Sequence, residues 1–412
     1  MRIAHLVHMY PPEFRGGTEA CVESLAAEQL ARGDEPLVIA GSDERSEAGE
    51  VTREEVGGVP VWRVRRTVHE NYSMDPRHPR VAGEVLRLLE QAAPAIVHVH
   101  HTLNLSGDVI SRVRAAGHTV VATLHDFTLV CARFFLARPD GESCAEHFPL
   151  PSERCLECVL PDFPGGREQL EHELRDRIAL SRSETAALAL AMVPSRFVAE
   201  RWQRSGLFDD ERLVLLPHAP RLPCAQPPEH VPAPDRLRLV TWGHLAPAKG
   251  VHHLLEAMSR LEDPRVSLAI LGEPTEAAYG ERLRALADGL PVVFHGAYRS
   301  DALVSQAAAC DLAVFPSLAE ETFGLVVAEA RALGLPVLVT DRGALAEGVG
   351  PAGDVVPAGD VQQLAGRLNS LLADPGTLAG WRAAAVDASL SPSGHATRVD
   401  DLYQRALQSR PA

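Results

Sequence analysis

The sequence has no hydrophobic run long enough to cross a membrane. The nearest candidate, residues 186–193, is about half the length that a transmembrane helix requires. The apolar run within residues 1–8 is also too short for a secretory signal peptide. We therefore expect a cytoplasmic protein that has no transmembrane segment.

The sequence also lacks an excess of basic residues. It carries 55 acidic and 40 basic side chains, which gives a formal net charge of −15. Because nucleic-acid-binding surfaces need clustered Lys and Arg, this balance argues against a nucleic-acid partner. Repeats and low-complexity segments are missing as well, and 46% of the 412 residues are hydrophobic, which is typical of a globular chain.

Apolar strand patterns alternate with helical patterns along the chain, which predicts an α/β fold. The first domain is expected at residues 1–217 and contains an irregular, cysteine-rich insertion at about residues 127–166. A proline-rich stretch, residues 218–235, is the expected linker. A second domain is expected at residues 236–390, and a final helix within residues 391–412.

The stretch from Glu320 to Glu329 carries the clearest signal for function. It follows a strand-like run, residues 311–316, and is expected to open a helix directly after Thr322 that ends near Leu333. The N–H groups at such a helix start attract an anion, and a carboxylate at Glu321 can accept hydrogen bonds from sugar hydroxyls. A surface helix with an acidic first turn explains the same residues equally well.

This stretch, E-T-F-G-L-V-V-A-E followed by A-x-A-L-G-L-P-V, resembles the E-x7-E signature of the retaining family 4 glycosyltransferases. Those enzymes have the GT-B fold, in which two Rossmann-like domains face each other across a cleft and the C-terminal helix crosses back to the N-terminal domain. The resemblance implies a retaining, hexosyltransferase-type enzyme that moves a sugar from a nucleotide-diphosphate sugar to an acceptor, either a small-molecule natural product or a saccharide. It assigns to the donor Glu321, Thr322, Phe323, Gly324, Leu325 and Glu329, with Glu321 on the sugar and Glu329 on the ribose.

Segments of the first half match the family too. The loop at Gly16 and Gly17 resembles the one that lies against the donor phosphates, although a glycine pair alone is usually a turn. The T-L-H that ends at His125 resembles the family's T-x-H, whose His reaches the reactive centre of the donor sugar, so His125 is a catalytic candidate. His100 and His101 end a stretch that resembles the family's D-V-V-H-x-H near the acceptor, while alternating His and Val also fit a half-exposed strand.

Residues 243–250 resemble the family's G-R-L-x-x-x-K-G, in which Arg and Lys neutralise the donor diphosphate. Lys249 matches the Lys and is expected to act in catalysis through its charge, but His244 stands at the Arg position. Because a His is a poorer bidentate clamp for an anion, donor affinity is lower, another cation helps, or activity depends on pH. Tyr298 is expected beside the nucleotide base.

Four cysteines lie within 28 positions of the insertion. In a cytosolic chain such a set indicates first a structural Zn²⁺, with unligated thiols or a redox or iron–sulfur role as the alternatives. The expected ligands are Cys131, Cys144, Cys155 and Cys158. At the diphosphate itself the resemblance implies no divalent metal, and no D-x-D follows a strand in a suitable place.

Two other functions stay open at this point. A sugar-nucleotide epimerase of the same fold would turn over the donor with no acceptor present. A non-catalytic partner subunit is suggested by His244 and by His218, which stands where the family usually has Asn. The acidic motif residues and Lys249 argue against this second alternative.

Overall fold

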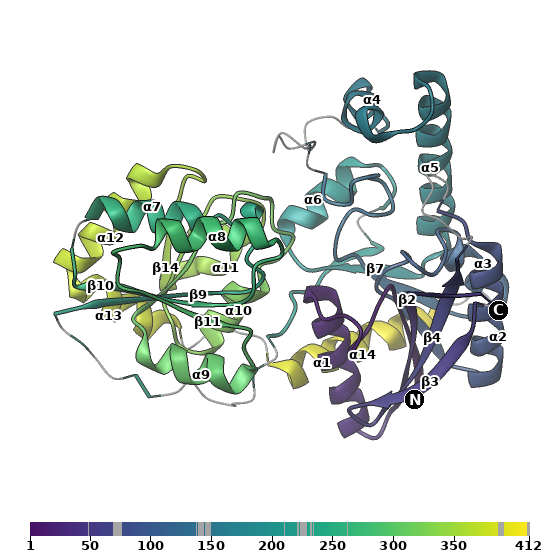
Figure 1. Cartoon of the computed structure of the whole chain (residues 1–412). Coiled ribbons are helices and arrows are strands. Elements are labelled where there is room, and N and C mark those ends of the chain that lie inside the picture. Colours follow the sequence, from purple (N-terminus) through teal and green to yellow (C-terminus); the bar gives the residue numbers. More distant parts are fainter. Residues whose placement is uncertain are drawn as a thin grey trace. The chain divides into compact units, whose positions relative to one another are not determined.

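A computed structural model describes residues 1–47, 49–68, 76–136, 138, 144, 150–209, 211–220, 222, 229–230, 233, 235–261, 263–385 and 391–409. The chain forms two compact units, Met1–His218 together with Pro392–Ala412, and Ala219–Ser391 (Figure 1). The division thus falls after residue 218, where we expected residue 217. Much of the expected linker, residues 218–235, lies outside the described residues.

Within the described residues, an eight-stranded sheet forms the centre of the first unit. Its strand order is β3-β4-β2-β1-β5-β6-β7-β8, and its neighbours are parallel except for β3 and β4, which form an antiparallel hairpin. The strands are β1 (Arg2–Val7), β2 (Glu35–Ser46), β3 (Val51–Val56), β4 (Val59–Thr67), β5 (Ile96–Val99), β6 (Val120–Thr123), β7 (Leu190–Val193) and β8 (Leu213–Leu215).

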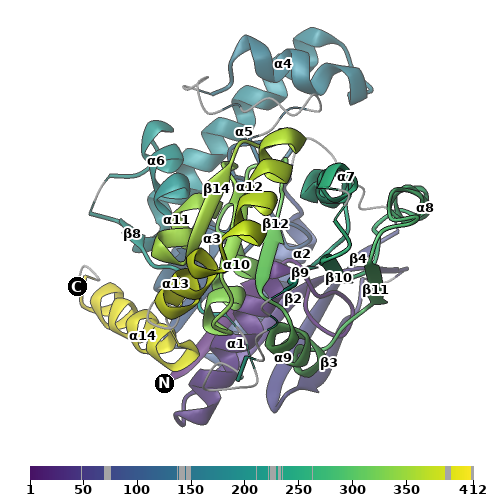
Figure 2. The same cartoon turned by 90° about the vertical axis from the view of Figure 1, so that its left-hand side faces the viewer.

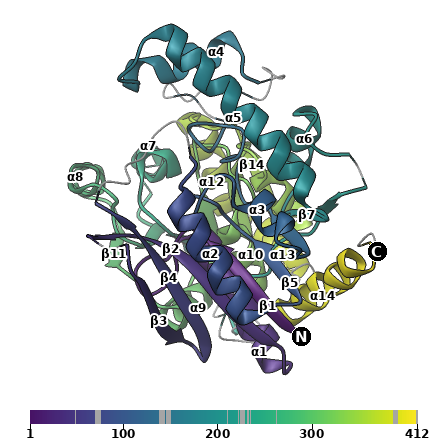
Figure 3. The same cartoon turned by 90° about the vertical axis from the view of Figure 1, so that its right-hand side faces the viewer.

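Helices cover both faces of this sheet because successive strand residues point to opposite faces. Leu6 of β1 packs with the core beneath α2, α3 and α6, whereas the next residue, Val7, packs with α1 on the other face. Figure 3 shows α2, α3 and α5 following one another across the first face. The helices are α1 (Gly17–Ala31), α2 (Pro79–Ala92), α3 (Val109–Ala115), α4 (Glu153–Val159), α5 (Arg167–Ala187) and α6 (Arg196–Arg204), with a short 3-10 turn at Leu160–Asp162.

The C-terminal helix α14 (Pro392–Gln408) belongs to the first unit and packs against α1 (Figure 2). Its Tyr403 is fully buried. The Tyr403 hydroxyl lies 2.7 Å from Nδ1 of His98 and accepts a hydrogen bond from Nε2 of Gln29 at 3.5 Å. The last helix therefore adds one polar group to a buried polar cluster of the first unit.

The described part of the second unit contains a six-stranded, fully parallel sheet in the order β11-β10-β9-β12-β13-β14. Leu239 of β9 packs with α7, α8 and α12, and its neighbour Val240 packs with α9, α10 and α11 on the opposite face. The strands are β9 (Leu237–Trp242), β10 (Val266–Leu271), β11 (Val292–Gly296), β12 (Leu312–Phe315), β13 (Val337–Thr340) and β14 (Gly353–Val356). The helices are α7 (Val251–Leu261), α8 (Ala277–Leu286), α9 (Ser300–Ala309), α10 (Leu325–Ala332), α11 (Leu345–Val349), α12 (Val361–Ala373) and α13 (Pro375–Ala385), with 3-10 turns at Pro247–Lys249 and Gly350–Ala352.

Each unit is therefore an α/β layer structure of the expected kind. In both, the carboxyl ends of the parallel strands meet at one edge, where ligands bind in such sheets. His100 and His125 follow β5 and β6, while Lys249 and Glu321 follow β9 and β12. None of the helices in the described residues is both long and apolar enough to span a bilayer.

Candidate active site

Two of the expected donor residues meet in the second unit. The Nζ atom of Lys249 lies 2.6 Å from Oε1 of Glu321, and the Ser317 hydroxyl donates to the same oxygen at 2.9 Å. The side chain of Lys249 is 44% exposed and that of Glu321 is 19% exposed, so a ligand from solvent can reach both. Lys249 is also the only lysine in the sequence, since every other basic residue is an arginine.

Backbone contacts hold the Lys249 loop against the loop of Glu321. The carbonyl oxygen of Ala248 accepts hydrogen bonds from the N–H groups of Leu318 at 2.8 Å and Ala319 at 3.1 Å. Gly250 makes the turn after Lys249 with φ +68°, and a Cβ atom there would lie 1.9 Å from the carbonyl oxygen of Pro316. Only glycine fits this close approach, so the K-G pair has a structural reason.

The backbone of Glu321 is fixed from its other side by the loop after β13. The Ala344 N–H donates to the carbonyl oxygen of Glu321 at 2.7 Å. Gly343 has φ +63°, and a Cβ atom there would lie 2.2 Å from the same oxygen. The carboxylate is therefore presented by a loop that two neighbouring strands hold in place.

Helix α10 begins at Leu325, which corrects the expected start directly after Thr322. The reason is Gly324, which has φ +82° and therefore leaves the helical region. A Cβ atom on Gly324 would lie 2.6 Å from Cδ2 of Leu345 in α11. Thr322 and Phe323 are half-buried residues of the loop before this turn.

Glu329, on α10, accepts a hydrogen bond from the indole N–H of Trp242 at 2.8 Å. Burial raises the pKa of Glu329 to about 7, although the Trp242 hydrogen bond acts in the opposite direction. Burial and the nearby Glu329 also raise the pKa of Tyr298, which places these two expected donor residues near each other. His244 is exposed, in the loop that begins after Trp242.

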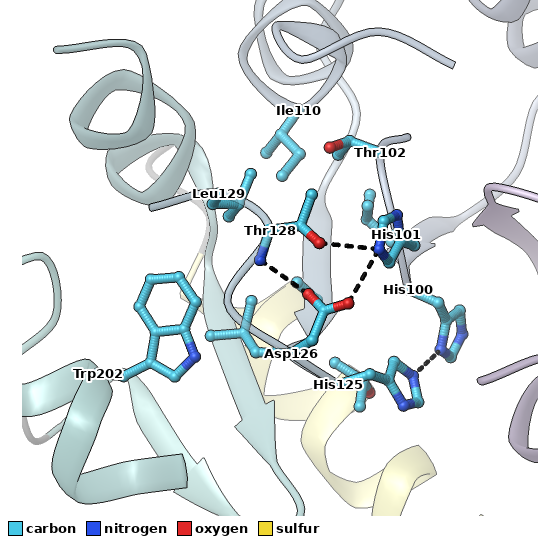
Figure 4. Close-up of a pocket in the computed structure, with 13 residues that line it drawn as sticks. His100, His101, Thr102, Ile110, His125, Asp126, Thr128, Leu129 and Trp202 are labelled. Atoms are coloured by element: carbon cyan, nitrogen blue, oxygen red, sulfur yellow. Dashed lines mark hydrogen bonds and ion pairs between the residues drawn. The ribbon is translucent and has the colours of Figure 1, made fainter. Parts of the chain in front are cut away.

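A chain of hydrogen bonds connects three buried histidine rings in the first unit. Nε2 of His5 lies 2.7 Å from Oε1 of Gln29, and Nδ1 of His5 lies 3.1 Å from Nε2 of His100. Nδ1 of His100 lies 3.1 Å from Nε2 of His125 (Figure 4). An amide oxygen can only accept, so His5 carries its proton on Nε2 and accepts at Nδ1. Nε2 of His100 therefore donates to His5, and Nε2 of His125 donates to Nδ1 of His100. Both rings carry their proton on Nε2, and Nδ1 of His125 is left as an acceptor.

Burial keeps these rings neutral. It lowers the pKa of His5 to about 4 and holds the pKa values of His100 and His125 well below the usual range. The ring of His218 stacks on His125 at 4.8 Å between centroids, and burial lowers the pKa of His218 to about 3. His125 is therefore a neutral hydrogen-bonding group rather than a cation.

His101 does not join this chain. Its Nδ1 accepts the N–H of Leu103 at 3.1 Å, so its proton is on Nε2, which lies 3.0 Å from both the Asp126 carboxylate and the Thr128 hydroxyl. Figure 4 shows these three side chains pointing toward one another. His101, Asp126 and Thr128 also line a hollow of about 30 Å³. The hydrogen-bond partner of the Asp126 carboxylate is thus His101 rather than its sequence neighbour His125.

The N–H of Gly16 donates to the carboxylate of Glu19 at 2.9 Å. Glu19 is buried, burial raises its pKa, and its other oxygen lies 3.2 Å from Nε2 of His8. Gly17 is exposed as the first residue of α1. A phosphate at Gly16 and Gly17 must therefore compete with Glu19 for the Gly16 N–H.

The four cysteines of the insertion are neighbours in space. Burial and the three other thiols raise the pKa of Cys144 to about 12. Among the described residues, the groups whose ligand atoms lie within 4.8 Å of one another are His5, His98 and His100, and Cys21, His125 and His218. The cysteines Cys131, Cys144, Cys155 and Cys158 do not reach that spacing, so the expected zinc stays a prediction.

Sequence reasoning missed Gln29, His5 and Trp242. His5 had a weak signal, because it lies on β1 directly opposite His98 of β5. The histidines at alternate positions of these strands share one face of the sheet. Gln29 and Trp242 had no local signal, since their partners are 24 and 87 residues away in the sequence.

The fold defines the class of protein. The chain is similar to sucrose-phosphate synthase of Thermosynechococcus elongatus, with a TM-score of 0.71 and 20% identity over 100% of both chains. It is also similar to Anabaena HepE in complex with UDP and glucose, with a TM-score of 0.67 and 18% identity over 98% of this chain and 100% of that chain. The architecture is that of the GT-B glycosyltransferases, as expected from the sequence.

Two family models match consecutive parts of the chain. The model described as Glycosyltransferase Family 4 matches residues 15–219, and the model described as Glycosyl transferases group 1 matches residues 236–374. The chain belongs to the family 4 glycosyltransferases.

Its relatives act on different molecules. Sulfoquinovosyl transferase SQD2 of Arabidopsis thaliana is 32% identical over 146 residues, which is 34% of this chain and 28% of the relative. A D-inositol 3-phosphate glycosyltransferase of Streptomyces bingchenggensis is 36% identical over 159 residues, 35% of each chain. The matches thus span about a third of these two relatives. The GDP-mannose-dependent α-(1-6)-phosphatidylinositol dimannoside mannosyltransferase of Mycobacterium tuberculosis is 27% identical over 353 residues, 84% of this chain and 81% of the relative.

Proposed function

We infer that this glycosyltransferase moves a hexosyl group from a nucleotide-diphosphate sugar to an acceptor with retention of configuration. The observation that carries this proposal is the Lys249–Glu321 pair at the carboxyl edge of the second unit. The two groups have opposite charge and are partly exposed, so they can separate at low cost when a donor arrives. UDP and glucose bound to the similar Anabaena HepE, and the GDP-mannose named for the mycobacterial relative, support a nucleotide-sugar donor.

On this proposal Lys249 exchanges its carboxylate partner for the donor diphosphate and stabilises the charge that develops as the phosphate departs. The exchange frees the Glu321 carboxylate to accept hydrogen bonds from the sugar hydroxyls, so Glu321 binds the sugar rather than attacking it. When Glu329 is ionised, its carboxylate accepts hydrogen bonds from the ribose, while the Trp242 indole N–H donates to the same carboxylate. The acceptor oxygen forms the new bond to the sugar, and its proton passes to the departing phosphate.

His125 is assigned to the donor sugar as a neutral ring. With its Nε2 proton held toward His100, its Nδ1 is the atom that can accept a hydrogen bond from a sugar hydroxyl. His100 positions His125, and His101 is positioned by Asp126 and Thr128 on the acceptor side. The acceptor is therefore assigned to the first unit.

The proposal is tested by thermal stabilisation with UDP, GDP, ADP, dTDP and CDP, followed by product analysis with the matching sugar nucleotide. A nucleotide at about 100 times its Kd should stabilise the protein by roughly 2.7 kcal/mol. An anomeric proton coupling in the product that matches the donor confirms retention, and an inverted coupling refutes it. Donor turnover without any acceptor supports the epimerase, and no stabilisation by any nucleotide supports the non-catalytic subunit.

A structural zinc ion at Cys131, Cys144, Cys155 and Cys158 is a separate proposal. Four thiols of the type that binds zinc lie near one another. A metal ion bound by them would stabilise the irregular insertion that carries them. Metal analysis of protein never exposed to a chelator should find about one zinc per chain. Less than about a tenth of an equivalent of zinc contradicts this proposal.

A further inference from the structure

A large cavity lies in the first unit. Its volume is about 520 Å³, which is in the range of pockets that hold small molecules. It is walled by the loop after β5, the segment after β6, the end of the cysteine-rich insertion and the inner face of α5. The insertion therefore builds one wall of a binding-sized space.

Most of the cavity wall is apolar. It includes Leu103, Leu129, Phe134, Val159, Phe163 and Leu180. Water in a space lined by such side chains cannot make its usual hydrogen bonds, so an apolar group that displaces it gains free energy. The cavity is therefore suited to the apolar body of a ligand.

Several charged groups of the wall are already paired inside the protein. Arg133 donates to the carbonyl oxygen of Cys158 at 2.8 Å and forms an ion pair with Asp162. Glu184 is fully buried, and its carboxylate accepts the N–H groups of Ile110 at 2.8 Å and Ser111 at 3.2 Å. These groups shape the wall without needing a ligand.

Arg177 of α5 is different. Its side chain is part of the wall, and the residue is only 8% exposed. Its Nη2 donates to the carbonyl oxygens of Thr128 and Cys131, but its Nε is buried and has no hydrogen-bond partner among the described residues. No carboxylate of the described residues lies within ion-pair distance of Arg177 either. A buried cation with an unused N–H is costly unless an oxyanion meets it.

The cavity also adjoins the histidine site. Thr102, Thr128 and Leu129 line both the cavity and the smaller hollow that His101 and His125 border. A molecule in the cavity therefore ends beside the residues that the proposed function assigns to acceptor and donor sugar.

We propose that this cavity binds the acceptor, and that the acceptor is an amphipathic molecule whose apolar body fills the cavity and whose carboxylate or phosphate meets Arg177. The identification of the bound molecule as the acceptor rests on the proposed function. The binding of an amphipathic anion in the cavity does not depend on that function. The oxyanion anchors the molecule at α5, and the apolar body leaves a hydroxyl group free toward His125.

Calorimetric titration with three ten-carbon probes tests the proposal: decanoate and decyl phosphate below their micelle concentrations, and decanol below its solubility limit. One equivalent of at least one anionic probe should bind about tenfold more tightly than decanol, as expected for a charge-assisted hydrogen bond. The tighter of the two anions identifies carboxylate or phosphate as the natural group. Equal binding of all three probes, or no binding of any, overturns the proposal.

Three variants locate the binding site. Leu180→Trp fills the cavity and should abolish binding of every probe, while Arg177→Gln should reduce anion affinity to that of decanol. Arg182→Gln removes an exposed charge from the same helix and should leave binding unchanged. Because Arg177 also holds the loop at Thr128, the Leu180 variant decides if the Arg177 variant does not fold. Unchanged binding in Leu180→Trp contradicts the proposal.

Nucleotide stabilisation, measured on the same preparations, separates the two proposals. Anion binding without any nucleotide binding refutes the proposed transfer but retains the cavity as an amphiphile site. Nucleotide binding without probe binding refutes the cavity proposal and leaves the transfer intact.

Discussion

Lys249 and Glu321 lie 72 positions apart in the sequence, yet their charged atoms are 2.6 Å apart. Three tight backbone approaches, at Gly250, Gly343 and Ala344, hold the two loops that carry them. The pair is partly exposed, so it contributes at most about 1 kcal/mol to stability. Its contribution to folding is therefore small, and a role in ligand binding is the proposal that the variants below test.

Lys249→Ala and Glu321→Gln should each reduce transfer by roughly 100-fold or more, since each removes a group that acts on the donor in the transition state. The free energy of unfolding should change by no more than about 1 kcal/mol. Steady-state kinetics and thermal unfolding measure the two effects. The matched control is Glu320→Gln, which alters the neighbouring carboxylate and should keep near-normal activity. Near-normal turnover in both main variants refutes the site assignment.

Glu329→Gln should raise the melting temperature at pH 8 but not at pH 5. The folded pKa of Glu329 is about 7, above its unfolded value of 4.5. Folding therefore favours the protonated carboxyl group, and wild-type stability falls as the pH rises from 4.5 to 7. The neutral amide avoids this cost, and the same substitution should weaken nucleotide binding.

The pH series of melting temperatures should be repeated with Glu281→Gln, which alters an exposed carboxylate of the second unit. That control should show no pH-dependent gain. A stability difference for Glu329→Gln that is the same at pH 5 and pH 8 would show that burial does not raise the pKa of Glu329.

Gln29→Leu should change the tautomer of His125 indirectly, through the hydrogen bonds that connect the two residues. Loss of the amide acceptor frees His5 to change its tautomer, and the change passes through His100 to His125. Nitrogen NMR of labelled histidine should show His125 with its proton only on Nε2 in the wild type and shared between both nitrogens in the variant. Transfer should fall about tenfold, as expected when one oriented hydrogen bond to substrate is weakened.

Gln29→Glu restores an acceptor at the same position and should return His125 to the Nε2 form. Nucleotide binding should be unchanged in both variants, because the residues proposed to hold the diphosphate and the ribose, Lys249 and Glu329, belong to the second unit. A pure Nε2 tautomer of His125 in Gln29→Leu would show that the hydrogen bonds from Gln29 through His5 and His100 do not set the tautomer of His125.

The first unit should unfold in mild acid before the second. Burial depresses the pKa values of His5, His98, His100, His125 and His218 below their unfolded value of 6.5. The stability that depends on neutral rings is complete above pH 6.5 and is lost as the pH falls. The loss is about 1.4 kcal/mol per pH unit for each histidine that protonates only on unfolding.

Hydrogen exchange between pH 4.5 and 7.5 resolves the two units in the intact chain. Amides of β1, β5 and β6 should lose protection first, while β9 and β12 keep theirs. In the second unit Glu329 has the opposite pH dependence, which adds to the contrast. Simultaneous loss of protection in both sheets contradicts this prediction.

The features that could be predicted from the sequence are those that a local pattern of residues encodes. Strand and helix periods predicted two α/β units. The family resemblance assigned Glu321 and Lys249 separately to the donor, and the fold brings their side chains together. The sequence did not predict the start of α10 at Leu325, because Gly324 leaves the helical region to pass Leu345, a contact made by tertiary structure. The histidine chain was missed because the register of β1 and β5, and the packing of α1, decide which rings meet.

The most direct test of the proposed donor site uses the single lysine of the sequence. Protein labelled with carbon-13 at lysine Cε gives one side-chain NMR signal, which belongs to Lys249. Glu321→Gln should move this signal in the free protein, and a nucleotide that stabilises the wild type should move it in a saturable manner. A signal that stays unchanged when such a nucleotide is bound would show that Lys249 does not hold the donor diphosphate, and would refute the proposed donor site.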